Sequence, residues 1–186
     1  YMLVDSAMLY QMIFDEQDIT KVVTSLLTNM NEMFKSKSSF NQDIRSWDVS
    51  NVEYMIGMFE GASSFNQDID DWDVSGVKDI RKMFSNASSF DQDISSWNVS
   101  NIYQMNNLFK STPFNQNIGS WDVSNVEIMN RMFEKATSFN QDISSWDVQN
   151  VTQMKNMFDS ASSFDQDLSS WNVSNVNNCE SFNNNT

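Results

Sequence analysis

Hydrophobic and polar residues follow one arrangement that recurs along most of this chain. In residues 40–64, FNQDIRSWDVSNVEYMIGMFEGASS, Trp47 and Val49 alternate with polar residues, which is the period-two pattern of a short half-buried strand. From Val52 to Ala62 the apolar residues fall at spacings of 3, 3, 1 and 3, which is the pattern of one helix face. Ser50 and Glu53 have the spacing of a helix-capping box. The unit is therefore predicted to contain one short strand followed by one short helix.

This unit is repeated six times over residues 40–182, and the last copy is partial. The repeats start at residues 40, 65, 90, 114, 139 and 164. Residues 19–39 fit the same frame less faithfully and are predicted to be a degenerate half-repeat. Residues 1–18 fall outside the frame and are predicted to be a helical capping segment, and residues 183–186 a tail.

A single repeat is too small to fold alone. Each large buried side chain contributes about 1.5–3 kcal/mol, whereas ordering each residue costs about 1.5 kcal/mol. Stacking solves this problem, because each repeat covers the flank of its neighbour. Strands stack about 4.8 Å apart but helices pack 8–10 Å apart, so the stack should curve. The predicted fold is α/β, a leucine-rich-repeat-like curved solenoid with one short parallel strand and one short helix per 25-residue turn.

Charge and composition narrow the functional classes. A net charge of −14 and a pI near 4.1 argue against binding to nucleic acid, and likewise against binding to anionic membrane surfaces. No stretch approaches the roughly 20 apolar residues of a membrane span, so we expect no membrane insertion. The start at Tyr1 and the end within a repeat indicate a processed or partial chain. Cys179 is the single cysteine, which excludes an intrachain disulfide, and we expect it to be a small buried hydrophobe.

The motif FNQDISSWDVSNV, followed by two Met residues three apart and then Phe, resembles the BspA-like class of bacterial surface-protein repeats, which are leucine-rich-repeat relatives of about 25 residues. The resemblance covers roughly residues 19–182. It implies an extracellular or cell-surface solenoid with a role in adhesion or surface architecture. It supplies no catalytic residues.

Aligned tryptophans have two explanations. Stacked indoles can bind sugars, but Trp47 shares its predicted strand face with Val49, which favours packing in a core ladder. The ladder consists of Trp47, Trp72, Trp97, Trp121, Trp146 and Trp171.

Two acidic rows recur at fixed places in the repeat. The first is a candidate metal row and contains Asp43, Asp68, Asp93, Asp142 and Asp167, with Asn117 in the short repeat. The second is a candidate binding surface and contains Asp48, Asp73, Asn98, Asp122, Asp147 and Asn172. Like charges at strand spacing repel, so each row requires compensation. Hydrogen-bonded turn aspartates and bound calcium both provide it; no other cofactor is expected.

A second pattern pairs the residue after each repeat Phe with the residue after each Trp. Every repeat carries one Asp across this pair, the other position being Asn. One hypothesis is a shared hydrogen-bond network that tolerates a single charge. The other is that repeats 4–6 descend from a duplicated block of repeats 1–3. The sequence does not decide between them.

Variation between repeats is concentrated on the predicted helix. Its outer positions read Glu53, Tyr54, Ile56 and Gly57 in one repeat and then change completely in the next, where Lys78, Arg81 and Lys82 form a basic cluster. Such variation serves partner recognition in some repeat proteins, and it is equally expected of a solvated face that is free to drift.

N-x-S/T sequons are frequent, and Asn86 and Asn184 are the most accessible candidates for glycosylation if the source is a secreting eukaryote.

The expected function is that of a non-enzymatic, extracellular or cell-surface repeat module for adhesion or surface assembly. Its partners would be a protein, a polysaccharide, or copies of the chain itself, because an uncapped end is a pairing edge. One alternative is a purely structural filament or spacer subunit. Another is a carboxylate-based solenoid hydrolase, which the near-identity of the Asp positions in every repeat disfavours.

Overall fold

A computed structural model describes residues 1–182. The chain begins with strand β1 (Met2–Leu3) and helix α1 (Ser6–Phe14), and returns through strand β2 (Val22–Val23), which pairs in parallel with β1. The side chain of Asp5 caps α1 by accepting a hydrogen bond from the Met8 N–H at 2.8 Å. Leu9 and Ile13, four residues apart, are the buried residues of α1.

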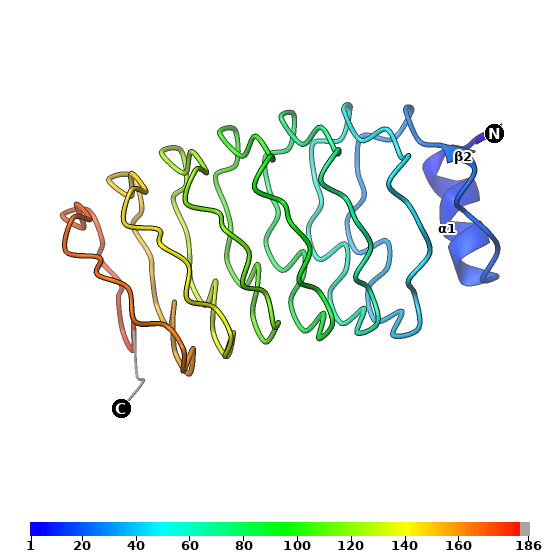
Figure 1. Cartoon of the computed structure of the whole chain (residues 1–186). Helices are drawn as coiled ribbons and strands as arrows, with labels where there is room; N and C mark the ends of the chain where they lie inside the picture. The colour runs from blue at the N-terminus through cyan, green and yellow to red at the C-terminus, as the bar shows by residue number, and fades with distance from the viewer. Residues whose placement is uncertain (183–186) are drawn as a thin grey trace.

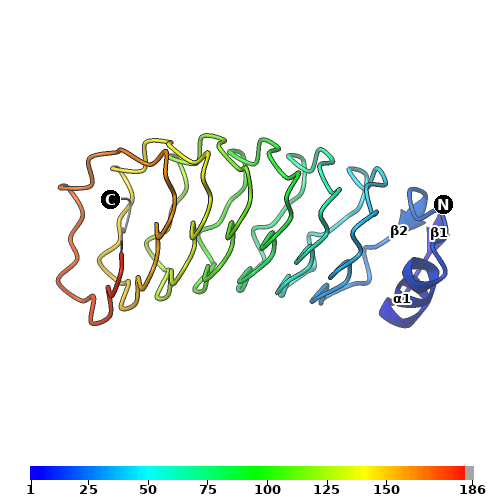
Figure 2. The same ribbon diagram turned by 90° about the horizontal axis from the view of Figure 1, so that it is seen from below.

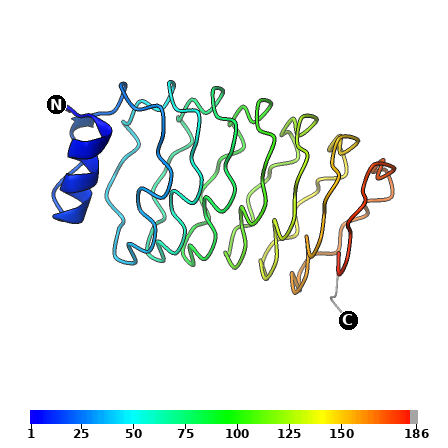
Figure 3. The ribbon, with the colours of Figure 1, turned by 180° about the vertical axis from the view of Figure 1, so that it is seen from behind.

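After β2 the chain winds into successive coils that lie side by side, with α1 at one end of the row (Figures 1 and 2). Each coil corresponds to one repeat of the sequence. Isolated parallel bridges join consecutive coils at one equivalent residue, which runs through Asn29, Tyr54, Asp79, Gln104, Ile128, Gln153 and Asn178. The row of coils bends gently along its length (Figure 3).

Overlapping β-turns replace the predicted helix. In residues 55–62 the N–H groups of Met58, Glu60 and Ala62 donate to carbonyls three residues earlier. The intervening N–H groups, beginning with Met55 to Asp79 at 3.1 Å, donate to the next coil. Each backbone donor is thereby satisfied without a strand or an α-helix.

Two residues per coil, four apart, hold this path in place by adopting positive φ. In the first full repeat, residues 40–64, they are Gly57 (φ 58°) and Gly61 (φ 71°), and elsewhere the same two positions carry Glu, Lys, Arg, Asn or Ser. A positive φ at the third residue is the requirement of a type II turn, and it interrupts an α-helix, in which every φ is negative.

The predicted strand at Trp47 and Val49 and the predicted helix over residues 52–62 are therefore wrong. Within residues 1–182, α1 is the sole α-helix and β1 and β2 are the sole strands of two residues or more. The packed helices that were expected to force curvature are not there. That the fold belongs to the leucine-rich-repeat-like solenoids stays a prediction.

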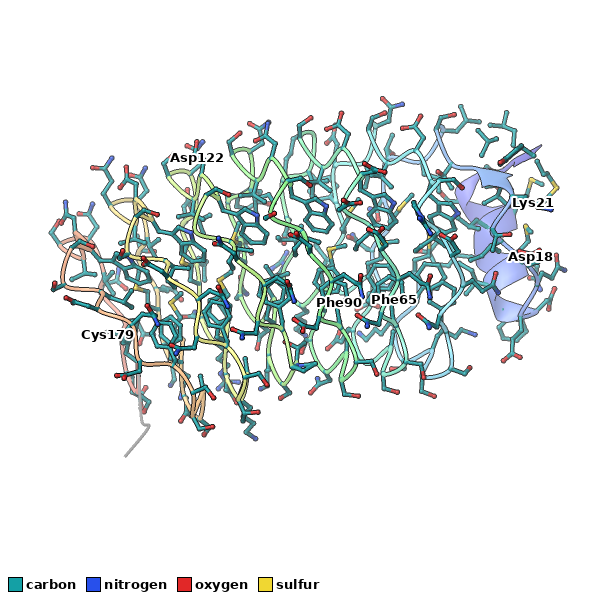
Figure 4. The ribbon with its side chains drawn as sticks, in the orientation of Figure 1. Asp18, Lys21, Phe65, Phe90, Asp122 and Cys179 are labelled. Carbon is teal, nitrogen blue, oxygen red and sulfur yellow. The ribbon has the colours of Figure 1, made fainter. Side chains whose placement is uncertain are left out.

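Aromatic columns fill the interior. The rings of Phe59 and Phe65 stack within one coil at a centroid distance of 3.8 Å, and Phe59 stacks on Phe84 of the next coil at 5.7 Å. The same arrangement recurs from Phe34 to Phe164. Figure 4 shows Phe65 and Phe90 inside the stack and Asp122 at its margin. Burial of a large apolar side chain contributes about 1.5–3 kcal/mol, so these columns supply much of the cohesion between coils.

An asparagine column ties the coils together at the residue after Ser50. The Nδ2 of Asn101 donates to the Ser75 carbonyl of the preceding coil at 2.7 Å, and four other coils repeat this bond. The column has one interruption, at Gly76, where an added Cβ would lie 3.3 Å from the Ser50 carbonyl oxygen.

Replacing Gly76 by Asn should stabilise the protein. The new amide can bond the Ser50 carbonyl as its equivalents do, and a net hydrogen bond contributes about 1 kcal/mol. The matched control is Gly76→Ala, which shares the added Cβ and the reduced freedom of the unfolded chain but lacks the amide. Urea unfolding should place Gly76→Asn about 1 kcal/mol above Gly76→Ala. Equal stability of the two variants would contradict a stabilising role of the asparagine column.

Candidate functional site

The two acidic rows consist of turn aspartates. In the first row the Oδ1 of Asp93 accepts from the Ser95 N–H at 2.9 Å, and in the second the Oδ1 of Asp122 accepts from the Ser124 N–H at 3.0 Å. Every other member of both rows accepts from the N–H two residues later in the same way. Asn117 and Asn98 do so as well, because the turn needs an acceptor oxygen and no charge.

These bonds stabilise the ionised carboxylates. The N–H and hydroxyl of Ser95 hold the pKa of Asp93 below its usual value, and the hydroxyl and N–H of Ser124 do the same for the pKa of Asp122. The pKa of Asp70 is raised instead, chiefly by a hydrogen bond with Asp68 and by desolvation.

The candidate metal row does not bring its carboxylates together in the described residues. Within residues 1–182, no group of three or more acidic, His or Cys side chains is placed to hold a metal ion. The members of the row, Asp43, Asp68, Asp93, Asp142 and Asp167, instead each cap their own turn.

The paired Asp and Asn positions belong to separate networks. In the first five repeats the residue after the Phe accepts from the equivalent N–H of the next coil, as Asn66 does from the Asp91 N–H at 3.0 Å. The residue after each Trp caps its own turn, as Asp73 does with the Ser75 N–H. The described residues contain no hydrogen bond that joins the two positions, which argues against the shared network. The duplicated block stays a hypothesis.

The tryptophan column is a structural element. The six side chains named above are 3–7% exposed. Each indole N–H donates to a carbonyl of the preceding coil, as Trp97 does to Ile69 at 3.0 Å. The ring faces are therefore not available for stacking on a sugar.

The variable residues form one continuous strip along the stack, which we call the variable face. It comprises the residues outside the hydrophobic core within 28–37, 53–62, 78–87, 103–112, 127–136, 152–161 and 177–182. It holds nine of the 11 Lys and Arg residues but only eight of the 25 Asp and Glu residues. The remaining 17 acidic residues share the rest of the chain with Lys21 and Arg45. One strip of this acidic protein is therefore close to neutral.

Ion pairs organise the variable face. Eight of the nine ion pairs among residues 1–182 lie on it. Several join adjacent coils, such as Lys78 with Glu53 at 2.7 Å and Lys110 with Glu134 at 3.1 Å. The predicted basic cluster does not exist as an unpaired patch, because Lys78, Arg81 and Lys82 each have an acidic partner.

Incompletely satisfied polar atoms are also concentrated there. In the described part of the chain, the buried side-chain atoms without a hydrogen-bond partner all belong to the variable face. They are Glu60 Oε2, Asp79 Oδ2, Arg81 Nε, Asn106 Oδ1, Glu134 Oε2 and Asn156 Oδ1. Asp79 is 1% exposed, and its burial raises the pKa of its carboxyl despite the Arg81 guanidinium 3.0 Å away. Burial of polar groups without full pairing is costly, and the three carboxylate oxygens among these atoms offset part of that cost through ion pairs with Lys or Arg.

Of the two sequons predicted to be accessible, Asn86 lies within the described residues. The backbone N–H of Asn86 donates to the Lys110 carbonyl at 2.8 Å, and its side chain is exposed. Asn184 lies outside the described residues.

The last described coil exposes apolar residues. Val173 is 50% exposed, and with Met154, Val176, Cys179 and Phe182 it lines a hollow of about 360 Å³. Cys179 is exposed rather than buried as expected, because no later coil among residues 1–182 covers it. Figure 4 shows it at that end of the stack.

Comparison with known protein families places the chain. A family described as "Mycoplasma protein of unknown function, DUF285" matches residues 5–113 and again residues 102–186. The chain belongs to this family. Two successive matches within one chain agree with a repeat protein, and the genus in the DUF285 description is bacterial. Neither the curated proteins nor the solved structures gave a match. None of the described residues forms a helix with the length and apolar character that crossing a bilayer requires.

The turn aspartates should make the protein sensitive to acid. Because the folded-state pKa of Asp93 and Asp142 lies below the unfolded value, their contribution is present above that value and is lost as pH falls through the folded pKa. The variant Asp93→Asn/Asp142→Asn should therefore lose less stability than the parent between about pH 5 and pH 2 in urea unfolding. Asn117 occupies the same position naturally, so the fold tolerates the change.

The variant Asp79→Asn should change the pH dependence of stability in the opposite direction. The raised pKa of Asp79 means that the ionised form destabilises the fold at neutral pH and that protonation relieves this. Asp79→Asn should be at least as stable as the parent at pH 7, and the difference should fade on acidification. A similar pH response of both variants would contradict these assignments.

Proposed function

We propose that this protein is a non-enzymatic, extracellular or cell-surface module that mediates adhesion or surface assembly by binding a protein or polysaccharide through its variable face. The observation that carries the proposal is the contrast between a backbone that is repeated from coil to coil and one strip on which the side chains differ. We also propose the finer relationship to BspA-like surface repeats, on the strength of the repeat motif. An enzymatic role is not proposed, because the acidic rows present the same turn in every coil and single out no position for chemistry.

Two features of the variable face suit a recognition surface. It carries partly exposed aromatic and branched apolar residues, namely Tyr54, Ile56, Tyr103 and Ile128. Aromatic residues such as Tyr are enriched at the centre of protein interfaces. Its near balance of charge spares a partner the repulsion that the acidic rows would impose.

The test exchanges residues between coils, so that each substitution is one the fold already contains. In the face variant, Tyr54→Gln and Ile56→Asn copy Gln104 and Asn106, and Ile128→Gln copies Gln153. In the matched control, Asp48→Asn, Asp73→Asn and Asp122→Asn copy Asn98 and Asn172. Beads coated with each protein are scored for attachment to cells, to extracellular-matrix proteins and to a polysaccharide array.

The face variant should lose at least about tenfold in binding, because two or more interface anchors of about 1 kcal/mol or more are removed. The control variant should bind as the parent does. Loss of binding in the control variant but not in the face variant would place the binding site on the acidic rows and contradict the proposal. Failure of the parent to bind any surface would also contradict it.

A second candidate, a filament or spacer subunit, rests on the position of exposed apolar side chains. Among residues 1–182, the large apolar residues that are 39–89% exposed lie at the two ends of the stack and not along its sides. They are Tyr1, Met2, Leu3, Met8, Tyr10, Phe14, Leu26 and Val173. Apolar patches of this kind promote association between copies.

Light scattering over a wide concentration range separates the two candidates. End-to-end association predicts a molar mass that rises with concentration and falls back in the variant Phe14→Ser/Val173→Ser. The rise should be the same with calcium and with a chelator, since the described residues hold no metal site. A constant monomer mass would contradict the filament candidate, and a mass that depends on calcium would contradict the account of the acidic rows.

A further inference from the structure

The junction between the N-terminal segment and the first coils contains a cleft of about 210 Å³. α1 covers this end of the row of coils (Figure 2). Its walls combine apolar, charged and hydrogen-bonding groups, of which six matter here: Ile13, Ile19, Phe40, Glu16, Lys37 and Asn41. The Gln42 side chain fixes the walls relative to each other, because its Oε1 accepts from the Ile19 N–H at 2.9 Å and its Nε2 donates to the Gln17 carbonyl at 2.9 Å.

Phe40 lines the cleft as the first ring of an aromatic column, and within its own coil it is stacked on Phe34 at 3.8 Å. Phe40 stacks on Phe65 of the next coil at 5.8 Å, and the column continues at spacings of 5.8–6.4 Å to Phe164. Phe65 and Phe90 are 0% exposed, whereas Phe40 is only partly buried. Within the described residues no ring precedes Phe40 in this column. A flat aromatic group in the cleft would extend the column by one member.

Next to this ring lies a backbone donor that lacks its usual partner. In later coils the equivalent N–H groups, from Asn66 to Asp165, each donate to an Asn or Asp Oδ1 of the preceding coil at 2.8–3.0 Å. The Asn41 N–H has no acceptor among residues 1–182. The cleft therefore presents a donor that, everywhere else in the stack, binds an amide or carboxylate oxygen beside a phenylalanine ring.

Lys37 adds a positive charge at a place where the other coils have none. Its equivalents are Ala62, Ala87, Thr112, Ala136 and Ala161. In the described structure the Lys37 ammonium has no carboxylate within ion-pair distance and lies 5.7 Å from the centre of the Phe14 ring. A cation in a partly apolar cleft attracts a carboxylate more strongly than one in open water.

Glu16 supplies the opposite charge on another wall. It adopts a positive φ of 54° directly after α1, and it forms no ion pair within residues 1–182. The cleft is thus lined by a lysine and a glutamate that form no ion pair among residues 1–182, by an N–H donor without an acceptor in the same range, and by an aromatic ring.

We propose that this cleft binds a free aromatic amino acid. Its ring lies on Phe40 between Ile13 and Ile19, its carboxylate meets the Lys37 ammonium and the Asn41 N–H, and its α-ammonium meets Glu16. A zwitterion satisfies both charged walls at once, whereas a simple anion would face the repulsion of Glu16 and a simple cation that of Lys37. Lys37 also belongs to the variable face, but the residues changed in the face variant do not line the cleft, so the two proposals are tested independently.

Isothermal titration calorimetry with L-phenylalanine tests the site. The parent should bind it more tightly than it binds 3-phenylpropionate, which lacks the ammonium, phenethylamine, which lacks the carboxylate, or L-alanine, which lacks the ring. The N-acetyl and amide derivatives of L-phenylalanine distinguish a free amino acid from the end of a peptide, and both should bind more weakly.

Variants locate the binding. Lys37→Ala copies the residue of the later coils and should weaken L-phenylalanine binding by about fivefold or more. Phe40→Leu and Glu16→Gln should weaken it similarly. The control Lys135→Asn removes a cation on a distant coil at a position where Asn86 shows the same positive φ, and it should bind as the parent does. Thermal unfolding of each variant confirms that it is folded.

Three outcomes would overturn the proposal. They are no binding of L-phenylalanine to the parent at millimolar concentration, equal binding by the parent and by folded Lys37→Ala and Phe40→Leu, and equal affinity for L-phenylalanine and L-alanine.

Discussion

The structure depends on how backbone hydrogen bonds are shared between coils. Along residues 55–62 the N–H groups alternate between carbonyls of the same coil and carbonyls of the next. Bonds of the first kind fix the shape of one coil, and bonds of the second kind fix the distance to its neighbour. Because unpaired buried backbone groups are costly, every coil must follow the same path. This requirement explains why the interior residues repeat so closely, since only the same side chains fill the same space each time.

The same constraint confines variation to one strip. Residues such as Trp97 and Asn101 bond the preceding coil and cannot change without breaking a column. The side chains of the variable face touch solvent or the adjacent coil, so they are free to differ. Ion pairs such as Lys110 with Glu134 then act between particular neighbours. Individually such pairs contribute little, yet they are among the few contacts that distinguish one coil from the next and thereby favour the correct order of stacking.

At the junction with the N-terminal segment, each residue can be compared with its equivalents in the later coils. An unpaired N–H or a lysine is unremarkable in an ordinary protein. Here Asn41 and Lys37 can be compared with the same positions in later coils, where the N–H is paired and the lysine is alanine or threonine. The departure from the pattern is what singles out the cleft, much as the buried Asp79 stands out on the variable face.

The sequence by itself determined the period of the stack, the identity of the buried columns and the segregation of variable residues, because these follow from which positions are apolar and which recur. It did not determine the local backbone. Spacings of three and four residues between Met55, Met58 and Phe59 are shared by a helix and by overlapping β-turns. The glycines at 57 and 61 were the one signal for turns, and other coils lack it. The tertiary structure decided between the two conformations, because only the neighbouring coil supplies acceptors for the N–H groups that a chain of β-turns leaves unpaired. It likewise decided that the acidic rows cap turns and that Asn41 faces a cleft, since both depend on which backbone groups lie nearby in space.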